Sequence, residues 1–170
     1  MLVKKQSFLA CELVVVVVLD NIRSTFNVGS IFRTADASGV FKIFLCGLTP
    51  CPPNSKISKV ALGAENYISW EKIKITWQLL KRLKKEGYFL IALEQNREAK
   101  DIFSLKATNF KKAEKIALIL GSETKGISPK ILKRTNLKVF IPMFGEKESL
   151  NVSVAFGVAI YQLRRILYNK

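Results

Sequence analysis

Runs of apolar residues without alternation recur along the chain and predict buried strands. The first is an uninterrupted Leu-Val-Val-Val-Val-Val-Leu segment. Continuous β-branched runs of this length are typical of parallel strands that are covered on both faces. We therefore expect strands at residues 13–19, 42–46, 89–93, 116–120 and 138–141.

Between these runs the apolar residues follow helical spacing. The first helix is expected to have Asn27 as its N-cap and Gly39 just after its end. A second helix, around residues 77–83, is surrounded by lysines, and the last helix, residues 153–167, is apolar on more than one face. A helix of that kind is expected to pack both on the sheet and on a second subunit. The apolar stripe of the first helix consists of Val28, Ile31, Phe32 and Ala35.

Alternating strands and helices predict an α/β domain with a mostly parallel sheet sandwiched by helices. With 170 residues the chain fits one domain, and we expect residues 1–170 to form it without a separate RNA-binding domain. Residues 49–59 are rich in proline and polar side chains, so we expect them to form a surface loop.

The composition adds a strong positive charge. The chain has 28 Lys and Arg against 13 Asp and Glu, which gives a net charge of +15. A domain this basic is expected to meet a polyanion, most often nucleic acid. The alternative is a lysine-rich surface that serves only solubility.

The residue types that are absent exclude several chemistries. There is no histidine, which excludes imidazole-based catalysis, and three cysteines without a Cys-x-x-Cys pair predict neither a disulfide framework nor a metal site. Glu12 interrupts the apolar N-terminus, and the run that follows is too short to span a membrane, which takes about 20 residues. We expect a cytoplasmic protein with no membrane and no metal. The cysteines are Cys11, Cys46 and Cys51.

Three polar segments, residues 27–33, 121–126 and 141–151, each lie next to a predicted strand. In an open α/β sheet, ligands bind outside the carboxyl ends of the strands, so these segments are expected to meet in one site. Taken alone, Asn27 is explained as a helix cap and Arg33 as a surface ion pair with Asp36. Neither residue identifies a function by itself.

The second and third segments carry glycines and small polar residues. Gly121 and Gly126 frame Ser-Glu-Thr-Lys, but the Gly-x-Gly-x-x-Gly and Gly-Lys-Ser/Thr fingerprints of NAD and ATP sites are missing. Glu123 either caps this turn or serves a ligand. Ser149, Asn151 and Ser153 can all cap the last helix, which needs only one cap. The surplus polar side chains suggest a ligand.

Together the three segments resemble the motifs of the SpoU (TrmH) family of SPOUT RNA 2′-O-ribose methyltransferases. The resemblance covers essentially the whole chain, in the family's order and spacing. It implies a five- or six-stranded parallel sheet with a C-terminal trefoil knot, a homodimer, and S-adenosylmethionine as cofactor. The quoted segments are Asn-Val-Gly-Ser-Ile-Phe-Arg at residues 27–33, Ile-Leu-Gly-Ser-Glu-Thr-Lys-Gly-Ile at 119–127, and Ile-Pro-Met followed by Ser-Leu-Asn-Val-Ser-Val-Ala at 149–155.

The same resemblance assigns site residues. Arg33 is implied as the catalytic arginine beside the ribose 2′-hydroxyl and its phosphate. Because a guanidinium stays protonated, orientation and charge stabilisation are favoured over direct base action. The other catalytic positions implied are Asn27, Glu123, Ser149 and Asn151. The cofactor-binding positions are Leu93, Gly121, Ile141, Met143, Ser149 and Leu150, with Gly121 allowing close approach.

RNA is the implied substrate, with tRNA slightly favoured over rRNA. A non-catalytic RNA-binding protein and a nucleotide-using small-molecule enzyme are the competing hypotheses; the full set of motif residues disfavours the first, and the missing phosphate fingerprints disfavour the second. Basic residues expected to contact RNA are Lys81, Arg82, Lys84, Lys85, Lys111, Lys112, Lys115, Arg164 and Arg165.

Overall fold

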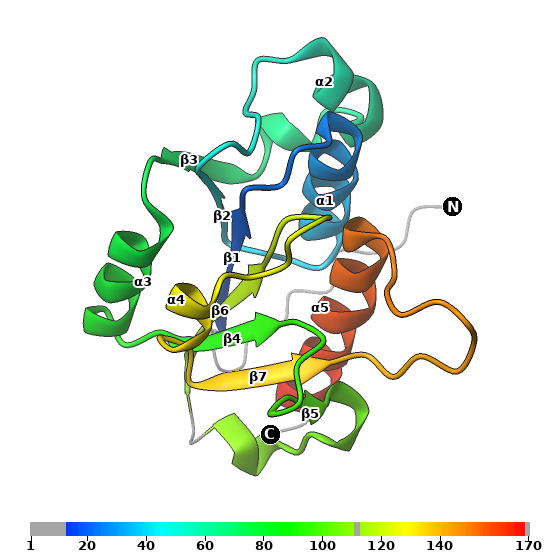
Figure 1. Ribbon diagram of the computed structural model, residues 1–170. Helices are drawn as coiled ribbons and strands as arrows, with labels where there is room; N and C mark the ends of the chain where they lie inside the picture. Colours follow the sequence, from blue (N-terminus) through cyan, green and yellow to red (C-terminus); the bar gives the residue numbers. More distant parts are fainter. Residues whose placement is uncertain (1–12, 111–112, 169–170) are drawn as a thin grey trace.

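A computed structural model describes residues 13–110 and 113–168, and the seven strands of these residues form one parallel sheet (Figure 1). The strand order is β3-β2-β1-β6-β4-β7-β5, and every pairing is parallel. The predicted α/β class is confirmed, but the sheet has seven strands where the resemblance implied five or six. The C-terminal knot stays a prediction.

The predicted strands are confirmed within one residue at their ends. Two further strands, Ser69–Ile73 and Lys100–Asp101, were not predicted. They lie at the two edges of the sheet and have no fully buried side chain, so neither contains a continuous apolar run. The strands are β1 (Val14–Asp20), β2 (Lys42–Cys46), β3 (Ser69–Ile73), β4 (Phe89–Leu93), β5 (Lys100–Asp101), β6 (Lys115–Leu120) and β7 (Leu137–Phe140).

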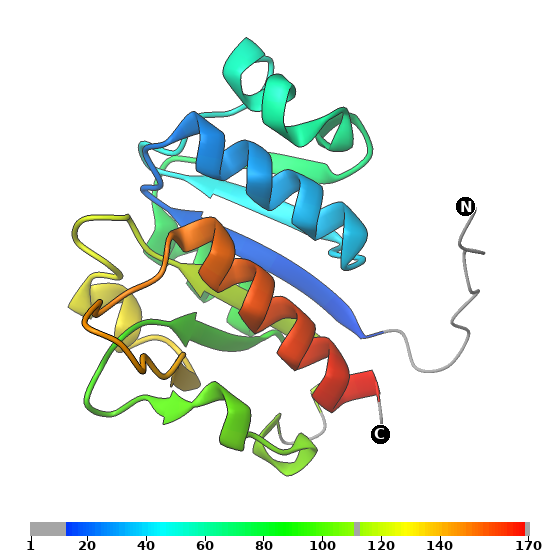
Figure 2. The same ribbon diagram turned by 90° about the vertical axis from the view of Figure 1, so that its right-hand side faces the viewer.

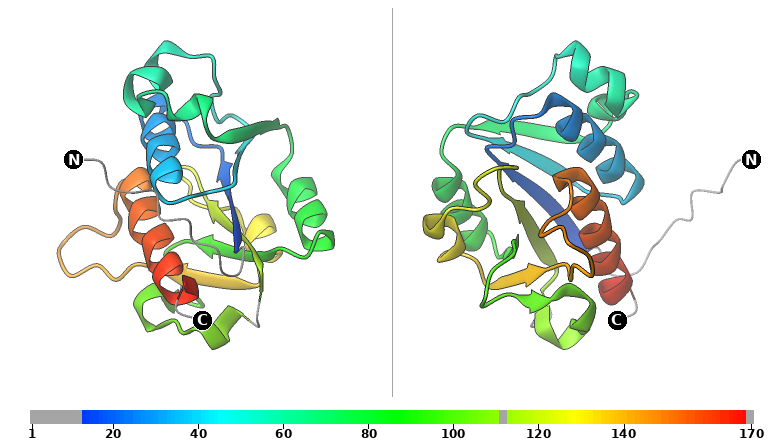
Figure 3. Two further views of the ribbon diagram at one scale, coloured as in Figure 1. Left: turned by 180° about the vertical axis from the view of Figure 1, so that it is seen from behind. Right: turned by 45° about the vertical axis from the view of Figure 1, so that its right-hand side comes forward.

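Helices cover both faces of the sheet. One face carries α1 (Thr25–Ala37) and α5 (Val152–Tyr168), which lie side by side in Figure 2, with α2 (Ser55–Ala61) packed on α1. The opposite face carries α3 (Thr76–Lys85) and the short α4 (Pro129–Leu132), as Figure 3 shows. Short 3-10 helices occur at Ala64–Asn66, Ile102–Ser104 and Ala107–Phe110.

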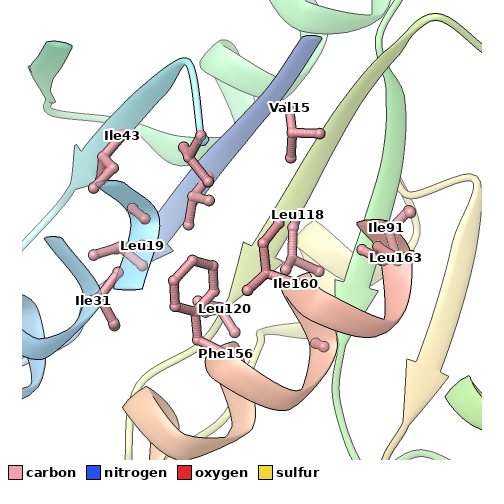
Figure 4. Close-up of a cluster of buried hydrophobic side chains, with 14 of the residues drawn as sticks. Val15, Leu19, Ile31, Ile43, Ile91, Leu118, Leu120, Phe156, Ile160 and Leu163 are labelled. Carbon is pink, nitrogen blue, oxygen red and sulfur yellow. The ribbon is translucent and has the colours of Figure 1, made fainter. Parts of the chain in front are cut away.

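The buried side chains form two clusters, one on each face. In β1, Val15, Val17 and Leu19 point toward α1 and α5, while Val16 and Val18 point toward α3 and α4. Phe156, Ile160 and Leu163 of α5 fill the first cluster at helical spacing (Figure 4). Because side chains alternate across a strand, the unbroken valine run supplies both cores.

Two local predictions are wrong. Asn27 is not the N-cap of α1; Ser24 is, and its hydroxyl accepts a hydrogen bond from the Asn27 backbone N–H. Residues 49–59 are not wholly a loop, because α2 begins at Ser55. Asn54 caps that helix by accepting from the backbone N–H groups of Lys56 and Ile57. The helix is short and buries few apolar side chains, so it shows little helical periodicity. The prolines directly before it make the whole segment resemble a loop.

Some expectations fall outside the described residues. These concern the N-terminal segment through Glu12, including Cys11, and the basic residues Lys111 and Lys112. Within the described part, no helix combines the length and hydropathy needed to cross a bilayer.

Candidate active site

The carboxyl ends of four neighbouring strands, β1, β6, β4 and β7, lie at one edge of the sheet. A cavity of about 560 Å³ opens there. It is lined by residues that follow β4, β6 and β7 and by the start of α5. The convergence predicted from parallel strand ends is therefore observed, with segments from the middle and the end of the chain facing each other.

Glu123 connects the loop after β6 to the start of α1. Its Oε1 accepts hydrogen bonds from the Ser24 backbone N–H at 3.1 Å and from Asn27 Nδ2 at 2.9 Å, and its Oε2 accepts from the Arg23 backbone N–H at 3.0 Å. Partial burial acts to raise the pKa of Glu123, but these donors outweigh it and hold the pKa below its usual range. The side chain is therefore an ionised acceptor at neutral pH.

Asn27 extends this connection to the third segment. Its Oδ1 accepts a hydrogen bond from Asn151 Nδ2 at 3.0 Å, while its own Nδ2 serves Glu123. Asn151 is the N-cap of α5, since its Oδ1 accepts from the Ser153 backbone N–H at 2.9 Å and its carbonyl accepts from Ala155 N–H. Ser24 and Asn151 do the capping, which leaves the Asn27 amide free to join the two helices through Glu123 and Asn151.

Two residues next to the predicted Leu93 were missed. Glu94 follows β4 and its Oε2 accepts from the Ile127 backbone N–H at 2.5 Å, which supports the loop after β6. Gln95 Nε2 donates to the Ile141 carbonyl at 2.9 Å, which holds the loop after β7. Both line the cavity. The available signal was a pair of polar residues directly after a buried strand.

Gly121 has a structural explanation within its own loop. A Cβ at this position would lie 2.3 Å from the Gly126 carbonyl carbon and 2.4 Å from the Ile127 nitrogen. Close approach is therefore required, but the group that approaches is the loop backbone. The turn is closed by a hydrogen bond from the Gly126 N–H to the Ser122 carbonyl.

The structure gathers most of the predicted site residues around the cavity; Asn27 is joined to them through Glu123 and Asn151, and Arg33 is separate. Arg33 lies on α1, is exposed, and makes no ion pair with Asp36 or with any other described carboxylate. It stands about 9 Å along the helix from Asn27, given the helical rise per residue, and does not line the cavity. The predicted residues that do line it are Leu93, Gly121, Glu123, Ile141, Met143, Ser149, Leu150 and Asn151.

Residues 14–161 match the model of the SpoU rRNA Methylase family, and the chain belongs to that family. It is 30% identical, over 88% of its length, to the tRNA (guanosine(18)-2′-O)-methyltransferase of Aquifex aeolicus. It spans 68% of that protein and 57 to 59% of the other curated relatives compared.

Solved structures agree. An AdoMet-bound rRNA methyltransferase from Sinorhizobium meliloti superimposes with a TM-score of 0.82 at 25% identity, covering 91% of this chain and 57% of that one. A structure concerned with 2-OH methylation of C/U34 on tRNA superimposes with a TM-score of 0.79 at 25% identity, covering 92% of this chain and 98% of that one.

Proposed function

We propose that the protein transfers a methyl group from S-adenosylmethionine to a ribose 2′-hydroxyl of structured RNA. The observation that carries the proposal is the hydrogen-bonded series from Glu123 through Asn27 to Asn151, which joins three separate motif segments beside one cavity. Membership of the SpoU family supports the same conclusion, as does the net charge of +15.

The cavity fits the proposed cofactor. A volume of about 560 Å³ lies in the range of small-molecule sites. Its walls combine apolar side chains, Leu93, Ile141, Met143 and Leu150, with the polar Ser149 and exposed backbone of the loop after β6. We assign the apolar residues to the adenine and methionine portions. Bound S-adenosylmethionine supplies a methyl group on a sulfonium centre that is open to direct displacement.

The protein's own contribution is then positioning. Glu123 and Asn27 hold the start of α1 and the loop after β6 at fixed separation, and Asn151 fixes the start of α5. We assign Arg33 to the acceptor RNA, where its guanidinium orients the phosphate and stabilises charge on the 2′-oxygen. Its exposure and its place outside the cavity suit a group that meets RNA and not cofactor.

The substrate is either a tRNA or an rRNA, because the names of the relatives include methyltransferases for both. We favour tRNA, since the structure concerned with tRNA methylation is a chain that this one spans almost entirely. By the same comparison we propose that residues 1–170 act as a single methyltransferase domain.

We also propose a homodimer formed through α1 and α5. Phe26 of α1 and Val154 and Tyr161 of α5 leave more than half of their side chains exposed on one side of the molecule. Val154 and Tyr161 lie seven residues apart and so share one face of α5, and contiguous exposed apolar side chains mark interaction surfaces. We also propose a cytoplasmic location, which suits the unpaired Cys46 and Cys51. Burial raises the pKa of the Cys46 thiol to about 12, so this thiol stays protonated at neutral pH.

The test is tritiated methyl transfer from S-adenosylmethionine to unmodified bulk tRNA and, separately, to unmodified rRNA, with nuclease mapping of the labelled ribose. Label on a 2′-oxygen is expected and identifies the RNA class. No label combined with no cofactor binding would replace the proposal by a non-catalytic RNA-binding protein. Binding is measured by thermal shift, since ligand at 100 times its dissociation constant stabilises by about 2.7 kcal/mol.

A further inference from the structure

Two cations, Lys130 of α4 and Arg134 just after that helix, are stacked on one aromatic ring of α3. Lys130 Nζ lies 4.7 Å and the Arg134 guanidinium carbon 5.7 Å from the centroid of the half-buried Trp77 ring. Arg134 also donates to the Lys130 carbonyl at 2.6 Å. Cation–π contacts of this kind hold long basic side chains in place without neutralising them. The arrangement therefore presents two fixed positive charges at the surface between the helices.

Further cations lie on the same face of α3 as Trp77 and next to Arg134, and they have no acidic partners among the described residues. Lys81 and Lys84 of α3 and Lys133 after α4 are exposed, and none of them forms an ion pair with a carboxylate of the described residues. Arg82 behaves differently, because Glu71 and Glu86 occupy its guanidinium. Clustered charges of one sign repel each other, so an uncompensated group of this size favours binding of a polyanion.

The group begins at the mouth of the cavity. Lys125 lies in the loop after β6, is exposed, and lines the cavity. The same loop leads directly into α4, which packs against α3 (Figure 1). Along the chain, Lys125 at the cavity mouth is therefore followed by Lys130 and Arg134, and the lysines of α3 lie on the helix that packs against α4.

We propose that this α3–α4 surface, formed by Lys125, Lys130, Lys133, Arg134, Lys81 and Lys84, binds the phosphate backbone of the RNA next to the target nucleotide. The inference rests on the proposed RNA substrate and identifies where that RNA lies. Phosphate contacts set register and affinity without choosing a sequence. Trp77 acts as a positioning residue, which holds two of the phosphate-binding cations.

Other basic residues do not compete for this role. Arg164 is half-buried and donates to the Ser38 carbonyl at 2.9 Å and to the Gly39 carbonyl at 2.5 Å, so it holds α5 against the end of α1. Lys115 lies over the Tyr88 ring and reaches the Glu86 carbonyl. Of the basic residues predicted from sequence, Lys81 and Lys84 belong to the proposed surface.

The experiment compares charge reversals on the two sides of the sheet. Lys130→Glu/Arg134→Glu and Lys81→Glu/Lys84→Glu change the proposed surface, and Lys56→Glu/Lys59→Glu on α2 makes the same change in net charge elsewhere. The affinity is measured, as a function of KCl concentration, for the unmodified RNA that accepts label in the methyl-transfer test. Each α3–α4 variant is expected to bind about tenfold or more weakly and to reduce the slope of log K against log salt by about 2, one unit per lost phosphate contact.

The control variant is expected to retain most of the affinity and the wild-type slope, and all variants are expected to bind S-adenosylmethionine normally. Affinity losses equal to those of the control, or none, would overturn the proposal. If the wild-type protein binds cofactor and RNA, and the variants bind RNA as tightly as the wild type does, only this surface is rejected. A wild-type protein that neither methylates RNA nor binds it rejects the proposed function itself.

A second measurement does not depend on charge-reversed variants that can fail to fold. The chain has two tryptophans, so Trp70→Phe leaves Trp77 as the only indole. Its fluorescence is expected to change on saturation with RNA, because phosphates bound to the two cations held on the ring alter the electric field at the indole. Unaltered emission at saturating RNA would count against the α3–α4 surface.

Discussion

The helical layers on the two faces of the sheet present different outer surfaces. The α1–α5 layer leaves Phe26, Val154 and Tyr161 more than half exposed. The α3–α4 layer presents lysines and arginines around Trp77. One valine run in β1 supplies both cores, although the core under α1 and α5 is much the larger. The outer surfaces differ in kind, and we propose a protein partner for one and a polyanion for the other.

The candidate site lies between the two layers. Glu123 points from the loop after β6 toward α1, and Asn27 passes the connection to the start of α5. The same loop continues into α4 on the other face. A cofactor cavity is thus bordered by a proposed dimer surface on one side and a proposed RNA surface on the other.

Arg33 is the exposed cation of the α1–α5 layer that we assign to chemistry, and its removal should have the largest effect. Arg33→Ala is expected to lower kcat by roughly 10²–10³, the loss found when one preorganised donor is removed. Arg33→Lys keeps the charge but loses the planar fork, so it should restore only part of the activity. Steady-state methyl transfer and cofactor affinity are measured together. Wild-type turnover in Arg33→Ala would refute the assignment.

The apolar surface of α5 should control self-association. Val154→Glu places a charge at each copy of a symmetric interface and should weaken the dimer by roughly 2–5 kcal/mol, since an unpaired charge is desolvated there. Gln78→Glu, an exposed position on α3, adds the same charge to the other layer and should leave the dimer intact. Light scattering across a dilution series distinguishes them. Equal effects would place the interface elsewhere.

Close packing of α1 on α2 makes Gly29 intolerant of a side chain. A Cβ there would lie 2.7 Å from the Ile57 carbonyl oxygen and 2.9 Å from Val60 Cβ, so Gly29→Ala should cost about 1–3 kcal/mol of unfolding free energy despite alanine's better helix propensity. Gly157→Ala in α5 is the control. Its Cβ would meet only Thr34 Cγ2 at 3.9 Å, so this variant should be as stable as wild type or slightly more so. Chemical denaturation measures both; a stabilised Gly29→Ala would show that the helices separate easily.

The Glu123 connection should give the smallest effect and a pH dependence. Its folded-state pKa is lowered from the ordinary value of 4.5, so the stabilisation is present above that pH and disappears as pH falls through the folded value. Glu123→Gln should therefore cost about 1 kcal/mol at pH 7, discounted for exposure. The difference in Tm between the two proteins should shrink as the pH falls below 4.5 and vanish once the carboxylate of the folded protein is protonated. A difference that is constant with pH would mean that the charge is not involved.

Sequence patterns were most reliable where burial is complete. The valine run of β1 and the apolar spacing of α1 and α5 depend on contact with a core, and the structure confirms these elements. Strand β3 and helix α2 were missed because both lie at the periphery, where few apolar side chains are buried. Glu94 was passed over in favour of Leu93, although both line the cavity.

The sequence by itself determined the fold class, the positions of the central strands and the three segments that meet at their ends, because continuous apolar runs and helical spacing directly encode burial. Only the tertiary structure decided which side chains of those segments are hydrogen-bonded to one another. Capping by Ser24 frees the Asn27 amide for Glu123 and Asn151, which lie 96 and 124 residues away along the chain. Likewise, Trp77 meets Lys130 and Arg134 only because α3 and α4 pack on the same face. Such pairings depend on distances in space, which no local pattern in a chain contains.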